Sequence, residues 1–100
     1  MAKTEIEIIA RFKNHITTCG GPCCDWYVGI AQNPVTRLFN DHVVNKQTDV
    51  WIYDYAYTSD VARSVEKYFI ETLGCDGGAG GGDDTTNAVY AYKKNHRTNP

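Results

Sequence analysis

Three short runs of aromatic and β-branched residues restrict how this chain can fold more than any other feature of its sequence. The runs are WYVGIA at 26–31, DVWIYDYAYT at 49–58 and NAVYAYKK at 87–94. Their length and composition predict β-strands, the first of them buried. A helical pattern precedes each run, so we expect an α/β (α+β) fold in which about three helices flank a short central sheet.

The helices between these runs carry start and stop signals. The first, expected at about 4–17, opens on the capping box TEIE, in which a threonine and a glutamate satisfy the free backbone donors of the first turn. The second begins at Asn33 and Pro34, an N-cap followed by proline at the first helical position. The third ends at Gly74. The apolar residues predicted for the inner face of the first helix are Ile6, Ile9, Phe12 and Ile16.

Length and composition limit the class of protein. A chain of 100 residues predicts a single domain, here with a core at about 25–94. Hydrophobic residues make up 42% of the sequence and charged residues 22%, and no apolar run approaches the ~20 residues of a membrane span. Charges interrupt the isoleucines near the N-terminus, which is not typical of a secretory signal, so we expect a cytoplasmic protein.

The charge balance restricts how the protein could bind nucleic acid. The net charge is −2, which argues against binding by electrostatic attraction alone, because that mode needs many contacts between basic side chains and phosphates. KKNHR at 93–97 is the only basic cluster. Its Lys93 and Lys94 belong either to a solvated polar tail or to a local phosphate-binding surface.

Two features of the third helix and the loop after it are unusual. Glu66 falls on the flank of the apolar stripe, and a carboxylate that half faces a core needs a partner or a function. The loop at 74–84 is rich in glycine but lacks the Lys-Ser/Thr ending of a phosphate-binding P-loop, and its Asp83 and Asp84 would repel phosphate. We therefore expect either a flexible connection or the rim of an active site.

A longer pattern begins in the first predicted strand. YVG at 27–29, Asn33 at the helix start and Arg37 ten residues after Tyr27 resemble the second half of the GIY-YIG endonuclease signature. The resemblance covers about 27–87. It implies a GIY-YIG-like domain that hydrolyses phosphodiester bonds in nucleic acid with a divalent metal, Mg²⁺ or Mn²⁺. It also matches Glu66 to the family's metal-binding glutamate and Asn87 to a downstream asparagine.

The roles implied by this resemblance fit the chemistry of phosphodiester cleavage. Glu66 would hold the metal largely through water, because a hard cation with few protein ligands keeps much of its hydration shell. Arg37 would donate hydrogen bonds to the scissile phosphate, which its planar fork suits. Tyr27 would orient or deprotonate the attacking water, with His42 as an additional acid or base.

The first half of the family signature, Gly-Ile-Tyr on a preceding strand, is missing. No tyrosine precedes Tyr27, and the corresponding place holds His15 and Ile16. His15 could act chemically as a base in place of the missing tyrosine. If the first helix runs through it, however, its ring points elsewhere.

The histidine of the second predicted helix is displaced from its usual place in the family. The position four residues after Arg37 holds Asp41, and the histidine follows at His42. On an α-helix one residue corresponds to about 100°, which turns His42 toward the apolar face beside Leu38 and Phe39. A packed core histidine is therefore an alternative to a catalytic one.

Each candidate site residue also has a purely structural interpretation. Tyr27 could be core, Arg37 an exposed surface residue, Glu66 one half of an ion pair, and Asn87 a strand cap or a turn residue. The corresponding alternative function is a catalytically inactive module that binds a protein or nucleic acid. Cleavage requires Tyr27, Arg37 and Glu66 to converge on one surface. A pair between Arg37 and Glu66, or their placement on opposite faces, would exclude the enzyme.

The cysteines offer a competing metal site. Cys19, Cys23 and Cys24 lie close together, with Cys75 after the third helix and His15 four residues before Cys19. Zinc sites favour two residues between paired cysteines, whereas this loop has three and then none. The spacing disfavours structural zinc, and we expect reduced thiols.

Overall fold

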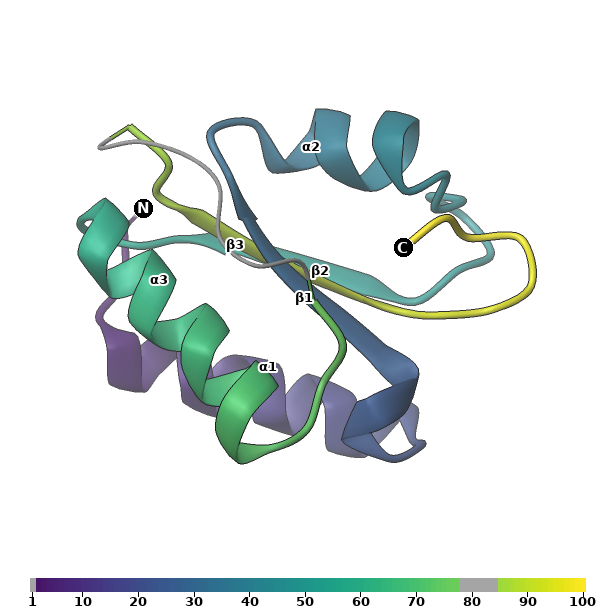
Figure 1. Ribbon diagram of the computed structural model, residues 1–100, viewed down its shortest axis with the longest axis horizontal. Coiled ribbons are helices and arrows are strands. Elements are labelled where there is room, and N and C mark those ends of the chain that lie inside the picture. Colours follow the sequence, from purple (N-terminus) through teal and green to yellow (C-terminus); the bar gives the residue numbers. More distant parts are fainter. Residues whose placement is uncertain (1, 78–84) are drawn as a thin grey trace.

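One antiparallel sheet lies at the centre of the protein, and the strand that comes last in the sequence forms its middle (Figure 1). The computed structural model describes residues 2–77 and 85–100. Within them the strands are β1 (Trp26–Ala31), β2 (Trp51–Tyr55) and β3 (Ala88–Lys93), in the order β1-β3-β2. Together with the helices this is the α+β fold expected from the sequence. Most of the predicted loop at 74–84 lies outside the described residues.

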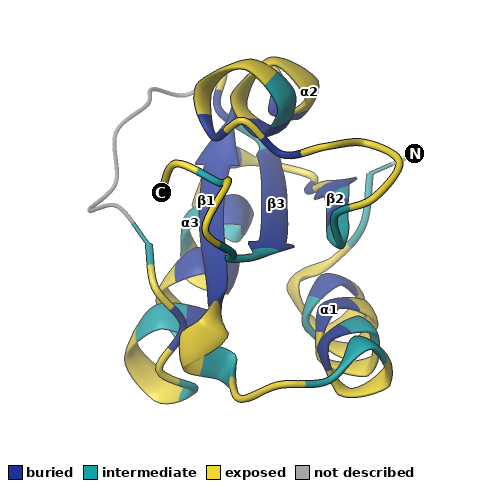
Figure 2. Ribbon diagram, turned by 90° about the vertical axis from the view of Figure 1, so that its right-hand side faces the viewer, coloured by how far each residue is buried: buried dark blue, intermediate teal, exposed yellow. Residues whose placement is uncertain are grey.

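Helices cover both faces of this sheet. α1 (Glu5–Cys19) and α3 (Ser59–Lys67) lie on one face, and α2 (Pro34–Thr36) lies on the other (Figures 1 and 2). α2 continues as a π-helical turn, Arg37–Asp41, and α3 continues as a second one, Tyr68–Thr72. Such turns carry one more residue than an α-helical turn and are common at functional sites.

The alternation of side chains along the strands divides the core into two layers. The layer under α1 and α3 contains Ile8, Phe12, Ile16, Trp26, Val28, Val65, Phe69, Val89 and Ala91. The layer under α2 contains Tyr27, Ala31, Leu38, Val44, Tyr90 and Tyr92. Successive strand residues therefore face opposite layers, as the period of two requires. The second layer is the unusual one, because three of its six buried residues are tyrosines.

The inner face of α1 differs from the predicted one. Ile8, Phe12 and Ile16 are buried, whereas Ile6 is 81% exposed and Ile9 is only partly covered. Residues spaced by four form the buried stripe, and Ile6 lies about 200° around the helix from Ile8. The capping box at Thr4 confirms the predicted helix start, and the burial of Phe12 and Ile16 confirms two of the predicted inner residues, whereas Ile6 was wrong and Ile8 was missed.

The two outer strands are protected against pairing with another chain. On β2, the backbone N–H of Lys3 donates to the carbonyl of Tyr55 at 2.8 Å, and Arg11 donates to the carbonyl of Tyr53 at 3.3 Å. On β1, the backbone of Asp76 exchanges hydrogen bonds of 2.8 and 2.9 Å with the outer edge. These backbone groups are therefore not available to bind a second strand.

Val43, which directly follows the candidate catalytic histidine, has an unfavourable backbone conformation. Its φ is +58°, a region where β-branched residues are rare, and its side chain is 52% exposed. Asparagine tolerates this conformation, so we expect Val43→Asn to raise the free energy of unfolding by about 1 kcal/mol in urea titrations. Val35→Asn, at another exposed valine, is the control and should bring no gain. A destabilised Val43→Asn variant would contradict the account.

Candidate active site

The sheet register brings a tyrosine from β3 to the glycine of β1. Gly29 lies directly opposite Tyr90, and Tyr27 lies opposite Tyr92. A β-carbon at Gly29 would stand 2.5 Å from the Tyr90 hydroxyl, so only glycine lets this side chain cross β1. Sequence reasoning missed Tyr90 as a site residue. The available signal was the alternation of tyrosines in NAVYAYKK, which indicates a tyrosine-lined face but not the strand it meets.

The π-helical turn after α2 determines where His42 lies. The backbone N–H of His42 donates to the carbonyl of Arg37 at 2.9 Å, five residues earlier. The turn therefore accommodates the additional residue that separates the histidine from the arginine. The sequence prediction assumed α-helical geometry and placed the ring beside Leu38 and Phe39. His42 is indeed buried, at 5% exposure, as expected for a packed core histidine. Its ring packs against the tyrosines of the layer that also contains Leu38, with its centre 4.6 Å from that of Tyr27.

The hydrogen bonds of His42 define its tautomer. Nδ1 lies 2.8 Å from the backbone carbonyl of Asn99, which can only accept, so Nδ1 carries the proton. Nε2 lies 2.7 Å from the hydroxyl of Tyr90. Burial lowers the pKa of His42, which favours the neutral ring. Nε2 is then an acceptor, and Tyr90 donates to it.

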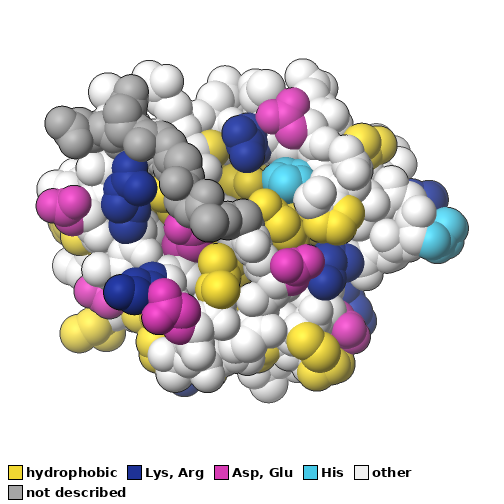
Figure 3. Space-filling view, viewed as in Figure 1, with side chains coloured by type: hydrophobic (Ala, Val, Ile, Leu, Met, Phe, Trp, Pro, Cys, Tyr) yellow, Lys and Arg dark blue, Asp and Glu magenta, His cyan; other side chains and the backbone are white. Residues whose placement is uncertain are grey.

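Arg37 reaches the same hydroxyl from the turn above. Its side chain hydrogen-bonds to Tyr90, while its Nε lies 3.4 Å from the carboxylate of Asp41. The side chain is 49% exposed, so it contacts the tyrosine at one end and solvent at the other. Figure 3 shows this face of the molecule, where histidine, basic and acidic side chains surround hydrophobic ones at and below α2.

Glu66 approaches from α3. Its side chain is buried, and burial raises its pKa from the ordinary 4.5 to about 7, an effect that nearby Arg63 opposes. The carboxylate is close enough to Tyr90 to contribute to the raised pKa of the phenol, about 12, of which burial is the main cause. No ion pair joins Glu66 to Arg37 within the described residues. The two side chains come from helices on opposite faces of the sheet, and what they share is an influence on the pKa of Tyr90, which Arg37 lowers and Glu66 raises.

The side chains of Tyr27, Arg37, His42 and Glu66 around Tyr90 are called the Tyr90 cluster below, and His15 is not part of it. It lies on α1, against the opposite face of the sheet, with its ring 5.8 Å from that of Trp26. It also hydrogen-bonds to the backbone of Trp51 and lines a cleft of about 390 Å³ with Arg11. The structure therefore does not place His15 where the missing tyrosine of the signature would act.

The residues proposed for nucleic-acid contacts are separated along β3. Asn87 precedes the strand, and its carbonyl accepts from the backbone of Ala56 at 2.8 Å. Lys93 and Lys94 stand at the other end, where the ammonium of Lys94 lies 3.0 Å from Asp76. Asn87, Lys93 and Lys94 therefore do not form one patch. Arg37, the fourth residue proposed for nucleic-acid contacts, is half exposed beside Tyr90.

The four cysteines are free thiols in different environments. Cys19 Sγ is 3.8 Å from Nε2 of His15, and burial, together with neighbouring Cys23, raises the pKa of the Cys75 thiol to about 12. Among the residues that the structure describes, no three histidine, cysteine or acidic side chains are arranged to hold a metal ion. Cys75 is a protonated, buried thiol at neutral pH.

The close approach of Tyr90 to Gly29 can be tested by stability. We expect Gly29→Ala to lower the free energy of unfolding by roughly 1–3 kcal/mol, because the added methyl group collides with the Tyr90 ring. The control is the same substitution in a Tyr90→Ala background, where the obstacle is gone and the cost should be small. Equal costs in both backgrounds, measured by urea unfolding, would contradict the packing.

Comparison with models of protein families, with curated proteins and with solved structures gave no match. No helix in residues 2–77 or 85–100 is long and apolar enough to cross a membrane. The chemistry of the Tyr90 cluster is therefore the basis on which a function can be assigned.

Proposed function

We propose that this protein is a divergent metal-dependent nuclease, similar to the GIY-YIG endonucleases, that hydrolyses phosphodiester bonds in nucleic acid. The observation that carries the proposal is a group of four side chains around Tyr90. Tyr27, Arg37, His42 and Glu66 all contact Tyr90 or influence its ionisation. Tyr27 and Arg37 come from the residues that resemble the family signature, Glu66 matches the family's metal ligand, and His42 is displaced by one residue from the family's histidine.

Tyr90 takes the place of the tyrosine missing from the first half of the signature. In the family that tyrosine precedes the second motif, whereas here it follows on β3, the middle strand of the sheet. Antiparallel pairing with β1 brings it beside Gly29 all the same. We infer that the chain keeps the family's arrangement of side chains with a changed order of strands.

The hydrogen-bond chain gives the attacking water a route for its proton. The side chain of Arg37 bonds to the Tyr90 hydroxyl, and that hydroxyl donates to neutral His42. When water attacks phosphorus, its proton passes to Tyr90 as the phenol proton moves to Nε2 of His42. No free phenolate forms, which matters because the pKa of Tyr90 is raised to about 12.

Arg37 and Tyr27 complete the contacts to substrate. The half-exposed guanidinium of Arg37 can donate to the scissile phosphate and stabilise the charge that develops on it. The ring of Tyr27 packs on His42 and holds it in the orientation that meets Tyr90. We assign Tyr27 to orienting the attacking water, since its ring lies beside both partners of the proton transfer.

In this proposal Glu66 would hold a magnesium or manganese ion with water as the other ligands, since no group of three histidine, cysteine or acidic side chains in the described part of the chain could hold one. Glu66 is a buried carboxylate with a raised pKa, and a bound cation would restore its ionised form. Water would fill the remaining coordination positions, as Mg²⁺ prefers. Such an ion would supply positive charge near the leaving oxygen.

A catalytically inactive binding module is the second candidate, and the net charge of −2 favours it. Nicking of supercoiled plasmid with Mg²⁺ and then Mn²⁺, over a range of salt concentrations, separates the two. We expect nicking by the wild type, a loss of at least roughly 100-fold in Glu66→Ala, and no change in Glu71→Ala. Glu71 is the matched control, because it is an exposed glutamate just beyond α3.

Two results would contradict the nuclease. One is no nicking by the wild type with either metal, which would favour the binding module. The other is equal nicking by the wild type and Glu66→Ala, which would mean that the activity belongs to another site or to a contaminant.

A further inference from the structure

The segment 95–99 folds back onto the candidate active site and bonds to its histidine. The backbone N–H of Asn99 donates to the carbonyl of His42 at 2.8 Å, and Nδ1 of His42 donates to the carbonyl of Asn99, also at 2.8 Å. These reciprocal bonds join residues 57 positions apart in the sequence. The histidine is thus held on one side by the segment and on the other by Tyr90.

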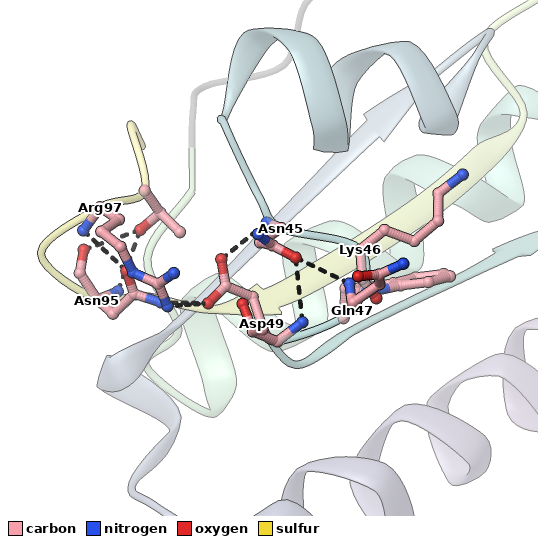
Figure 4. A network of polar contacts seen from close by, with 9 residues as sticks. Asn45, Lys46, Gln47, Asp49, Asn95 and Arg97 are labelled. Atoms are coloured by element: carbon pink, nitrogen blue, oxygen red, sulfur yellow. Dashed lines mark hydrogen bonds and ion pairs between the residues drawn. The ribbon is translucent and has the colours of Figure 1, made fainter.

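A buried carboxylate anchors the segment. Asp49, whose side chain is 2% exposed, accepts hydrogen bonds from Arg97 at 2.6 Å and from the side chain of Asn95 at 2.9 Å (Figure 4). Its other oxygen accepts from the backbone of Asn45 at 2.8 Å. A hydrogen bond of 3.1 Å from the Asn95 backbone to Thr98 closes the turn. Because Asp49 is buried, these contacts are less screened than an ion pair at the surface.

The carbonyl of Asn99 is the contact that distinguishes the two ring nitrogens of His42. The Tyr92 hydroxyl also lies near Nδ1, at 3.2 Å, but a hydroxyl can donate or accept and is compatible with either tautomer. The Tyr90 hydroxyl has the same ambiguity at Nε2. A backbone carbonyl can only accept, so Asn99 alone requires a proton on Nδ1.

We propose that the segment 95–99, anchored by Arg97 on Asp49, is a positioning element that fixes the Nδ1-protonated tautomer of His42 and leaves Nε2 free to accept from Tyr90. The catalytic assignment of His42 rests on the proposed nuclease function, whereas the tautomer is a property of the protein without substrate. Asn99 and Arg97 touch neither substrate nor metal in this proposal. Their effect on the reaction passes through the histidine.

The test compares the wild type with a variant that ends at Arg97 and with Arg97→Ala. Long-range ¹H–¹⁵N correlation spectra of the histidine rings at pH 8 report which nitrogen of His42 carries the proton. We expect the Nδ1–H form in the wild type, a large Nε2–H population in the shortened variant, and an intermediate one in Arg97→Ala. Arg97→Lys, which keeps the cation, and Lys94→Ala, which removes the surface pair with Asp76, are controls that should retain the wild-type tautomer.

Nuclease kinetics give the second readout. The wrong tautomer of a catalytic histidine can cost up to about 10⁴-fold in kcat, so we expect kcat of the shortened variant to fall at least tenfold with KM unchanged. An unchanged tautomer in both the shortened variant and Arg97→Ala would overturn the proposal. If the shortened variant does not fold, the tautomer of Arg97→Ala decides the question. We expect this variant to fold, because the Arg97 side chain is half exposed. A wild type without nuclease activity would refute the proposed function, while the spectra would still decide the role of the segment.

Discussion

Replacement of Glu66 by glutamine is expected to stabilise the metal-free protein by about 3 kcal/mol at pH 8 while removing its nuclease activity. The carboxyl is 8% exposed, and burial raises its pKa from 4.5 to about 7. At a pH between these two pKa values, Glu66 is protonated in the folded state and ionised in the unfolded state. The free energy of unfolding therefore falls as pH rises from about 4.5 to about 7 and is lowest above that window.

Glutamine does not titrate, so the difference between variant and wild type has a defined pH dependence. It should be near zero at pH 4 and reach about 3 kcal/mol above pH 7, from 1.36 kcal/mol per pKa unit. Urea unfolding at pH 4, 6 and 8 measures it, with Glu71→Gln as the exposed control. Mn²⁺ should stabilise the wild type at pH 8 but not Glu66→Gln. A stability difference that does not change with pH would contradict the burial of Glu66.

Replacement of Tyr90 by phenylalanine should lower the rate of cleavage by roughly 10²–10⁴-fold, the range for a lost proton-transfer group. Tyr92→Phe is a matched control, because Tyr92 is also a buried tyrosine of β3 within hydrogen-bond distance of His42. Its hydroxyl faces Nδ1, which Asn99 already occupies, whereas that of Tyr90 faces the accepting Nε2. We therefore expect Tyr92→Phe to change the rate only slightly.

Single-turnover cleavage of an oligonucleotide or plasmid measures the two variants under the same conditions. Each variant loses one buried hydroxyl, so the free energy of unfolding should fall by a similar amount in both, about 1 kcal/mol. Thermal unfolding measures this loss. Equal rate losses in the two variants would mean that the tyrosines act only through packing. A greater loss in Tyr92→Phe would reverse the assigned direction of the hydrogen-bond chain.

The strands were the most predictable part of the fold, because their signal is local. WYVGIA forms β1 over the predicted residues, whereas the predicted strand 49–58 shortens to Trp51–Tyr55 and 87–94 to Ala88–Lys93. Periodicity located the helices, but on α1 it included the exposed Ile6 and missed the buried Ile8. Periodicity also could not reveal the two π-helical turns, because α-helical and π-helical turns place apolar residues at similar intervals in the sequence.

The candidate site remains a prediction, and the sequence suggested only those of its residues that carry a local signal. Tyr27 and Arg37 follow from one short stretch, and Glu66 follows from its place on the flank of a helix. The contribution of Tyr90 depends on the pairing of β1 with β3, which the spacing of residues in the sequence does not encode. The contact of His42 with Asn99 uses a backbone carbonyl, and a carbonyl leaves no signature in a sequence.

The position of a bound manganese ion tests most directly whether these residues form one metal-dependent site. Mn²⁺ is paramagnetic and broadens the NMR signals of nearby nuclei, so a titration of the ¹⁵N-labelled protein at pH 8 locates it. We expect the amide signals of Gly29, Glu66 and Tyr90 to broaden first, and Glu66→Gln to abolish this selectivity. Broadening centred instead on exposed carboxylates such as Asp60, with these three signals unaffected, would contradict the proposed active site.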